Sequence, residues 1–170
     1  MNRPTINEYD SYFQRYLDQV PNGDFAFLFE ESTSNVMQFF GSIPKEKHDF
    51  SYTSGKWSIK TVLMHLIDTE RVFAYRALVT SRGDVDTQLQ PFDEDEYASA
   101  TDVSTRSIDS LLEEFLAVRR NTALLLEHMT DAQSAIVGKG PTHGISARAI
   151  AFILIGHVQH HISVVQERYL

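Results

Sequence analysis

Residues 59–79 read IKTVLMHLIDTERVFAYRALV, a run of over twenty positions without a glycine or a proline. Such a run favours one long helix, because both of these residue types interrupt helices. Ser58 precedes it as an N-cap candidate, and Arg82 and Gly83 follow it as the cation and glycine that suit a helix C-terminus. The sequence therefore predicts a helix over residues 58–82.

Three further segments have the apolar spacing of amphipathic helices. Apolar residues recur at intervals of three, four and seven in residues 24–42, from 104 or 105 to 129, and in 145–169. A shorter aromatic segment, residues 5–19, suggests a small helix packed on the outside. No strand pattern of convincing length competes. The prediction is an all-α four-helix bundle with an extra short N-terminal helix.

The two longer connections differ in character. Residues 83–103 are acidic and show little periodicity, so they predict a long crossing loop with one short turn of helix at most. Loops of this length in compact domains tend to be functional, and its acidic centre could cover a site. That centre comprises Asp93, Glu94, Asp95, Glu96 and Tyr97. Residues 137–144, VGKGPTHG, predict a turn, after which Ser146 or Thr142 would cap the last helix.

Length and composition limit the functional classes. A chain of 170 residues with 42% apolar and 22% charged residues fits a single globular domain, residues 1–170. Its formal charge of −8, without a visible basic patch, argues against nucleic acid and anionic membranes as partners. Neither a secretory signal nor a bilayer-spanning run is apparent, so we expect a cytoplasmic protein. Because cysteine is absent, a metal would need histidine or carboxylate ligands.

Histidines are concentrated near the C-terminus, where residues 156–170 read GHVQHHISVVQERYL. His157 and His161 are four residues apart, which places them on one helix face, and that face is otherwise apolar. His65, midway along the 58–82 helix, is also expected to point inward. Three histidines leave coordination positions open for water or substrate, which is typical of a catalytic rather than a structural metal site.

The same histidines also have a purely structural interpretation. A buried imidazole can be a hydrogen-bonded core residue, and the three would meet only if the second and fourth long helices face each other. The remaining histidines are less informative. His160 could support the ligands or point toward a neighbouring helix. We expect the others at the surface, namely His48, His128 and His143.

Charged residues near His65 supply further candidates. Asp68 and Glu70 could orient a ligand or transfer a proton, although acids on helices are usually solvated. Arg71, Arg76 and Arg148 could meet an anionic substrate, but helix arginines normally pair with acids, so they are left out of the predicted site. Trp57 is expected as a core or lid residue near the end of the bundle.

Three segments together resemble the DinB-like superfamily, in particular its YfiT-type branch of metal-dependent hydrolases: GKWSIKTVLMHLIDTERVFAYRALVTSRGD, PFDEDEYA and SARAIAFILIGHVQHHISVVQERYL. The resemblance spans nearly the whole chain from Asp24. It implies an up-down-down-up bundle in which His65, His157 and His161 bind a divalent metal ion, commonly nickel or zinc. It also implies a homodimer, for which the aromatic N-terminal segment and the first long helix could supply the interface.

Three functional hypotheses follow. The first is a metal-dependent enzyme, a hydrolase or a thiol S-transferase, acting on a small molecule such as a low-molecular-weight thiol. The metal would deprotonate a bound water or thiol near neutral pH. The second is a non-enzymatic metal-binding or stress-associated protein that retains the pocket. The third is a structural helical dimer with a buried histidine network and no metal. The sequence does not identify the substrate, because fold and metal site are shared more widely than chemistry.

Overall fold

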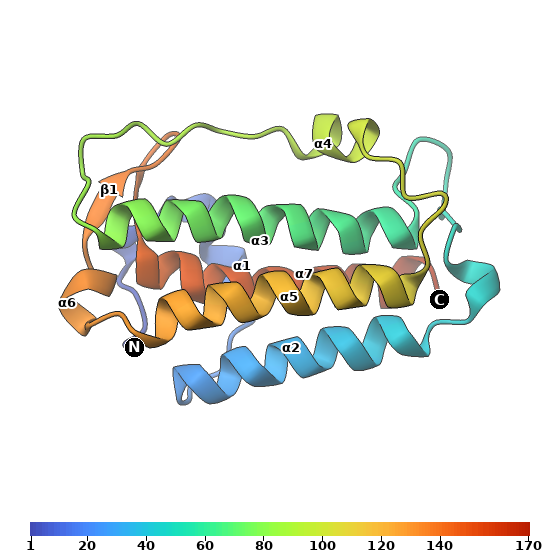
Figure 1. Cartoon of the computed structure of the whole chain (residues 1–170), viewed down its shortest axis with the longest axis horizontal. Helices are drawn as coiled ribbons and strands as arrows, with labels where there is room; N and C mark the ends of the chain where they lie inside the picture. The colour runs from blue at the N-terminus through green and yellow to red at the C-terminus, as the bar shows by residue number, and fades with distance from the viewer.

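Four long helices run side by side along the molecule in the computed structural model, which describes residues 1–170 (Figure 1). They are α2 (Phe25–Ser42), α3 (Ile59–Ser81), α5 (Ile108–Glu127) and α7 (Ala147–Arg168). Helices α3 and α2 each pack against both α5 and α7. Figure 1 shows α3 and α5 running in the direction opposite to α2 and α7, which is the up-down-down-up order. The predicted all-α four-helix bundle is confirmed.

Side-chain caps set where the long helices begin. Ser58 accepts a hydrogen bond from the backbone N–H of Thr61, and Gly83 has a positive φ of 80° just after Arg82 ends the helix. The predicted helix over residues 58–82 is therefore confirmed with its caps. The prediction of a third helix from residue 104 or 105 to 129 was too long, because Ser107 is the cap and the helix spans only Ile108–Glu127.

The connection between α3 and α5 must return along the whole bundle, because these two helices are parallel. It carries the short helix α4 (Glu94–Ala100), which begins where Asp93 accepts hydrogen bonds from the backbone N–H groups of Asp95 and Glu96. Earlier in the connection, the N–H of Leu89 donates to the carbonyl of Lys139 at 3.1 Å. The connection therefore lies against the bundle over α3, as Figure 1 shows.

The segment before α7 contains structure that was not predicted. A short helix, α6 (Asp131–Ser134), leads into two three-residue strands, β1 (Val137–Lys139) and β2 (Gly144–Ser146), which pair antiparallel. The predicted turn is present between the strands. Strands of three residues are too short for the alternation that identifies a strand in sequence. The hairpin ends at Ser146, which caps α7 by accepting from the N–H of Ala149.

The N-terminal segment forms three short turns instead of the single helix expected over residues 5–19. They are η1 (Ile6–Glu8), η2 (Ser11–Phe13) and α1 (Gln14–Leu17). This segment packs against α7, where Glu8 pairs with Arg148 and accepts a hydrogen bond from Ser146. Tyr16 and Leu17 are buried in the core of the chain itself. Tyr12 of this segment stays 53% exposed, and the expected place of the segment in a dimer interface stays a prediction.

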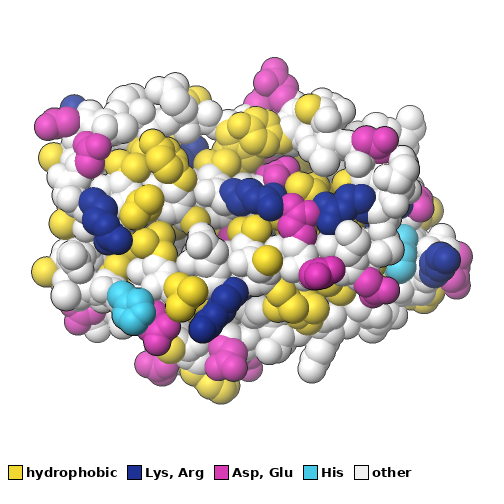
Figure 2. Space-filling view, in the orientation of Figure 1, with side chains coloured by type: hydrophobic (Ala, Val, Ile, Leu, Met, Phe, Trp, Pro, Cys, Tyr) yellow, Lys and Arg dark blue, Asp and Glu magenta, His cyan; other side chains and the backbone are white.

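Charges are mixed over the face of the molecule that Figure 2 shows, where acidic and basic side chains alternate between apolar ones. Helix α7 is long and apolar enough by composition to cross a membrane, but 67% of that apolar window is buried inside the bundle. Its hydrophobic character therefore has a simple explanation, because α7 packs against α1, α2 and α3.

Candidate metal centre

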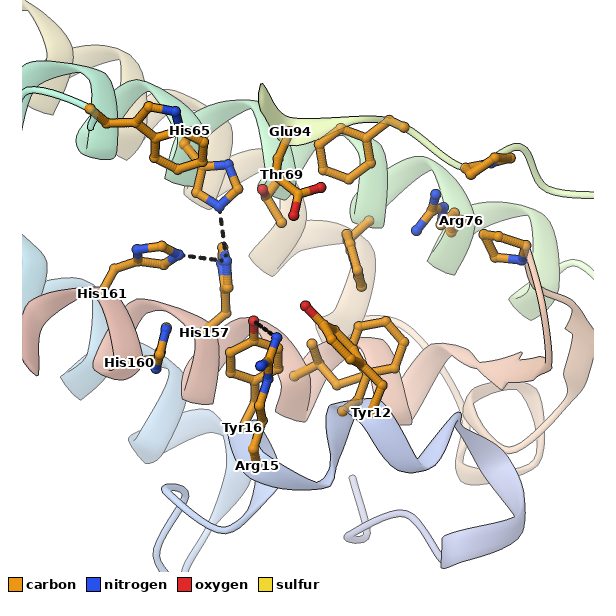
Figure 3. A pocket seen from close by; sticks show the side chains of 17 residues that line it. Tyr12, Arg15, Tyr16, His65, Thr69, Arg76, Glu94, His157, His160 and His161 are labelled. Atoms are coloured by element: carbon orange, nitrogen blue, oxygen red, sulfur yellow. Dashed lines mark hydrogen bonds between the residues drawn. The ribbon is translucent and has the colours of Figure 1, made fainter. Parts of the chain in front are cut away.

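The three predicted histidines converge where α3 and α7 pack together. The Nε2 atom of His157 lies 3.1 Å from that of His65 and 3.0 Å from that of His161, and all three rings offer a nitrogen within 4.8 Å of the others (Figure 3). His65 projects from the first half of α3, and the other two come from successive turns of α7. The second and fourth long helices therefore do face each other at this point.

Aromatic side chains hold the three rings in place. The ring centres of Trp57 and His65 are 4.8 Å apart, and those of Tyr16 and His157 are 5.3 Å apart in an edge-on arrangement. His65 is 9% exposed and His157 is 6% exposed, so both rings are almost removed from solvent. Trp57 thus lies at the end of the bundle as expected, directly against a histidine of the cluster.

Burial keeps the cluster uncharged at neutral pH. Desolvation lowers the pKa of His65 to about 4, and it lowers the pKa of His157 and of His161 well below 6.5, with repulsion from neighbouring histidines adding to the effect. A neutral imidazole has a free lone pair, which is the form that binds a metal ion. The low pKa values therefore prepare all three side chains as ligands.

The donor set fits a divalent metal ion. Two imidazole nitrogens bound tetrahedrally at 2.0–2.1 Å from an ion would be about 3.3 Å apart, close to the separations of 3.0 and 3.1 Å found here. Three neutral nitrogen donors without a thiolate suit zinc, nickel, copper or iron alike. No carboxylate oxygen of the chain forms a hydrogen bond with these rings. The arrangement leaves room for further ligands on the cavity side.

A cavity of about 410 Å³ opens directly beside the histidines. Its apolar walls include Phe73, Phe92 and Ile153, from α3, the long connection and α7. Figure 3 shows the histidines at one end of the cavity and Arg76 toward the other. Apart from the histidines, its polar lining consists of Tyr12, Arg15, Tyr16, Thr69, Arg76 and Glu94.

Two hydroxyl groups face this cavity in a state suited to binding a ligand. Thr69, one turn after His65, is 4% exposed and its Oγ1 atom has no hydrogen-bond partner. Burial raises the pKa of Tyr16 to about 12, so its hydroxyl stays protonated, and Arg15 donates a hydrogen bond to it at 3.0 Å. Spacing from His65 could have identified Thr69. Nothing in the sequence identifies Tyr16, because the fold of the N-terminal segment was not predictable.

The expected roles of Asp68 and Glu70 are not supported by their positions. Asp68 lies 3.6 Å from Arg71 outside the cavity, and Glu70 is fully buried on another face of α3, with its carboxylate 3.2 Å from Arg119. Glu70 is five positions after His65 and therefore lies on a different face of the helix, whereas the residue four positions after His65 lines the cavity. That residue is Thr69. Asp68 and Glu70 pair with arginines and do not line the cavity, so the structure offers no support for the predicted assistance.

The other candidate residues divide between the cavity and the surface. His160 lines the cavity, and its ring lies 5.1 Å from the ring of His161. Glu94 is the only member of the acidic loop centre in the lining. The remaining histidines lie away from the cavity, with His48 bonded to the carbonyl of Ile43, His128 exposed, and His143 beside Asp10.

The three candidate arginines also divide between the cavity and the surface. Arg71 pairs with Glu114 at 2.6 Å and Arg148 pairs with Glu8, as helix arginines usually do. Arg76 instead lines the cavity and has no carboxylate within ion-pair distance. The rule that helix arginines pair with acids at the surface, on which Arg76 was left out of the predicted site, does not hold for this buried side chain.

The fold and the histidine cluster agree with comparisons to known proteins. The family model of the DinB superfamily matches residues 28–165. A protein of Bacillus licheniformis, named as a candidate metal-dependent hydrolase, is 25% identical over 165 residues, which cover 86% of this chain and 93% of that protein. YfiT from Bacillus subtilis has a similar structure, with a TM-score of 0.74 and 18% identity, covering 98% of this chain and 90% of YfiT. YfiT is described as a candidate metal-dependent hydrolase with an unusual four-helix bundle topology.

Proposed function

Because the chain belongs to the DinB superfamily, we propose that it is a metal-dependent hydrolase of a small molecule, with His65, His157 and His161 holding a nickel or zinc ion. The observation that carries the proposal is the convergence of three neutral imidazole nitrogens at the end of a cavity of about 410 Å³. We prefer hydrolysis to thiol transfer because both similar proteins are described as hydrolases.

The residues around the cavity have distinct tasks in this proposal. A metal ion bound at the cluster would supply an acidified water and polarise a carbonyl group. The free hydroxyl of Thr69 binds and orients a polar atom of the substrate beside the histidines. Tyr16, which keeps its proton because burial raises its pKa to about 12, donates a hydrogen bond to negative charge that develops on the substrate.

Proton transfer needs a group that can accept a proton and is open to solvent. Glu94 is exposed and lines the cavity, on the side across from Tyr12 and Tyr16 in Figure 3. It begins α4, so its position depends on the connection that crosses over α3. We assign it as the proton acceptor in place of Asp68 and Glu70.

We further propose that the protein acts in the cytoplasm on a small molecule, without a nucleic acid or membrane partner, and as a homodimer. The charge of −8 and the burial of most of the apolar window of α7 support a small-molecule partner in the cytoplasm.

For the dimer, Phe27 on α2 offers an apolar side chain that is 63% exposed. Light scattering on wild type and on Phe27→Ser would test the dimer, which should dissociate in the variant.

Reconstitution tests the proposed activity directly. Protein stripped of metal with a chelator, then loaded with zinc or nickel, would be assayed on a chromogenic aryl ester and aryl amide, each with and without an added thiol. We expect turnover only in the loaded protein, a loss of about a hundredfold or more in His157→Ala, and unchanged turnover in His128→Ala. Equal rates in the loaded and stripped proteins would refute a metal-dependent hydrolase, and turnover that requires the thiol would favour transfer.

A further inference from the structure

One face of α3 carries four different chemical groups in a row. His65, Thr69, Phe73 and Arg76 follow one another at intervals of four, four and three residues, which keeps them on the same side of a helix. All four line the cavity beside the histidine cluster. Along the cavity, the wall therefore presents a metal ligand, a hydroxyl, an aromatic ring and a cation, in that order.

The cation at the end of this row is not neutralised by the chain. Arg76 is 4% exposed and lacks a carboxylate partner, and its one hydrogen bond runs from Nη2 to the carbonyl of Gln90 at 2.6 Å. Its guanidinium carbon lies 5.0 Å from the centre of the Phe73 ring and 5.8 Å from that of Phe92. A buried charge without a counter-ion is costly, so such a group is usually completed by a ligand.

Another buried arginine of the chain shows the contrast. Arg119 is 2% exposed and lies 3.2 Å from the carboxylate of Glu70. Arg119 also lines a cavity, and its N–H groups also lack hydrogen-bond partners, but its charge has a counter-ion. Arg76, which is 4% exposed, has no counter-ion, and its Nε and Nη1 groups make no hydrogen bond within the chain. These N–H groups are available as donors to an anion in the cavity.

The charges around the cavity also favour an anion. The lining contains two arginines, Arg15 and Arg76, against one carboxylate, Glu94. A divalent ion at the cluster would add to this excess. The cavity is thus a positive region in a chain whose net charge is −8.

From this arrangement, and resting on the proposed metal-dependent hydrolysis, we propose that the substrate is an amide or ester with a carboxylate at its far end, and that Arg76 binds this carboxylate. The apolar or aromatic body of the substrate lies over Phe73 and Phe92. The bond to be cleaved lies near Thr69 and the histidines. A carboxylate carries one charge, as Arg76 does, whereas a phosphate monoester would carry about two.

Helix geometry sets the length of such a substrate. His65 and Arg76 are eleven residues apart, which is about 16 Å along the axis of α3. Long helical side chains lean back toward the N-terminus, which brings the guanidinium several ångströms closer to the histidines. We therefore expect about 8–12 Å between the guanidinium of Arg76 and the histidine cluster. This distance corresponds to a substrate with roughly six to nine bonds between its carboxylate and its metal-binding group.

Two probes of this length measure the contribution of Arg76. One is octanedioic acid monohydroxamate, which has a metal-binding hydroxamate at one end and a carboxylate at the other. The second is the same molecule with a neutral primary amide in place of the carboxylate. In calorimetric titrations of the metal-loaded protein, we expect wild type to bind the carboxylate probe at least tenfold more tightly. We expect this preference to fall below about threefold in Arg76→Gln and to be partly kept in Arg76→Lys.

The variants are chosen to separate recognition from structure. A glutamine amide can still donate to the carbonyl of Gln90, so the connection over α3 should stay in place. Arg71→Gln is the matched control, because Arg71 lies on the same helix but pairs with Glu114 outside the cavity, and it should keep the full preference. If Arg76→Gln weakens both probes equally, or if wild type shows no preference, Arg76 only anchors the connection and the proposal is wrong. Should Arg76→Gln fail to fold, the comparison of wild type with Arg76→Lys decides in the same way.

A second pair of probes makes the result independent of the metal. On the stripped protein at pH 7.5, 4-phenylbutanoate should bind more tightly than 4-phenylbutanamide, and Arg76→Gln should remove the difference. A protein that retains no metal but shows this preference would refute the proposed function and support the anion site. A protein that binds metal and hydroxamate without any preference for the carboxylate would refute the anion site alone.

Discussion

A Cβ atom on Gly156 would clash with the carbonyl oxygen of Tyr16, because the N-terminal segment packs directly onto α7 at this glycine. The next residue, His157, meets the ring of Tyr16 edge-on at 5.3 Å. One close backbone approach therefore brings Arg15 and Tyr16 to the histidine cluster. The N-terminal segment is a wall of the candidate site and depends on the absence of a side chain at position 156.

Substitution of this glycine should loosen the wall. Gly156→Ala is expected to lower the free energy of unfolding by about 1–3 kcal/mol, because the added methyl group has no space, although alanine is otherwise the better helix former. Gly41→Ala on α2 is the control, since its Cβ would meet Leu112 at an ordinary 3.7 Å. Urea unfolding should show a loss for the first variant and none for the second. Equal stability of the two variants would mean that the segment is not held at Gly156.

The single tryptophan should report metal binding. The ring of Trp57 lies 4.8 Å from the ring of His65, so a nickel ion at the cluster would lie close enough to quench its fluorescence. We expect saturable quenching on titration of nickel into wild type and into His128→Ala. In His157→Ala the quenching should need at least tenfold more nickel. Identical titration curves in wild type and His157→Ala would place any bound nickel elsewhere.

The buried pair of Glu70 and Arg119 should matter for stability and not for the metal. Glu70→Gln leaves the guanidinium of Arg119 without its counter-charge, which is expected to cost about 3 kcal/mol of unfolding free energy. Metal content per folded chain should be unchanged. Asp68→Asn, at a half-buried position paired with Arg71, should change stability by less than about 1 kcal/mol. A loss of metal in Glu70→Gln would mean that Glu70 does help the histidines to bind the metal ion.

The metal-free protein should lose stability between pH 7 and pH 5. Burial lowers the pKa of His65 to about 4 and that of His157 well below 6.5, while both titrate near 6.5 in the unfolded chain. Below pH 6.5 the unfolded chain takes up protons that the native protein does not, so the free energy of unfolding falls as the pH falls. The expected decrease is on the order of 2 kcal/mol for each buried histidine by pH 5.

Urea unfolding in the presence of a chelator at several pH values would measure this decrease. Burial tends to raise the pKa of Glu8, but its hydrogen bonds, above all from Arg148, outweigh this and lower it to about 2. The contribution of Glu8 to the free energy of unfolding is therefore lost only below about pH 4.5, outside the interval from pH 7 to pH 5 in which the histidines act. His65→Leu should reduce the slope between pH 7 and pH 5, and His128→Gln should not. A flat profile in wild type would mean that the cluster is protonated in the folded protein.

The sequence predicted most of the bundle because its signals are local. Ser58, Gly83 and the apolar spacing act within a few residues of where they stand, and the four-residue interval of His157 and His161 fixes their common face. The start of α5 was misplaced because several serines and threonines precede it and only contact geometry selects Ser107. The direction of the helices came from the family resemblance and not from any local pattern.

The parts of the site that escaped prediction depend on distant contacts. Tyr16 reaches the histidines through the backbone contact at Gly156, which no spacing rule reveals. In the sequence, Arg76 looks like an ordinary helix arginine. It is buried because the connection that carries Gln90 and Phe92 packs against it. The pairing of Glu70 escaped prediction for the same reason, because its partner Arg119 comes from another helix. Tertiary packing decided each of these cases.

Metal content is the most direct test of the central claim. Wild type, His161→Ala and His128→Ala, all purified without a nickel column, would be supplied with equal zinc and nickel, dialysed and measured by elemental analysis. We predict about one metal ion per chain in wild type and in His128→Ala, and almost none in His161→Ala. A wild type that retains no metal, or a His161→Ala protein that retains as much as wild type, would contradict a three-histidine metal centre.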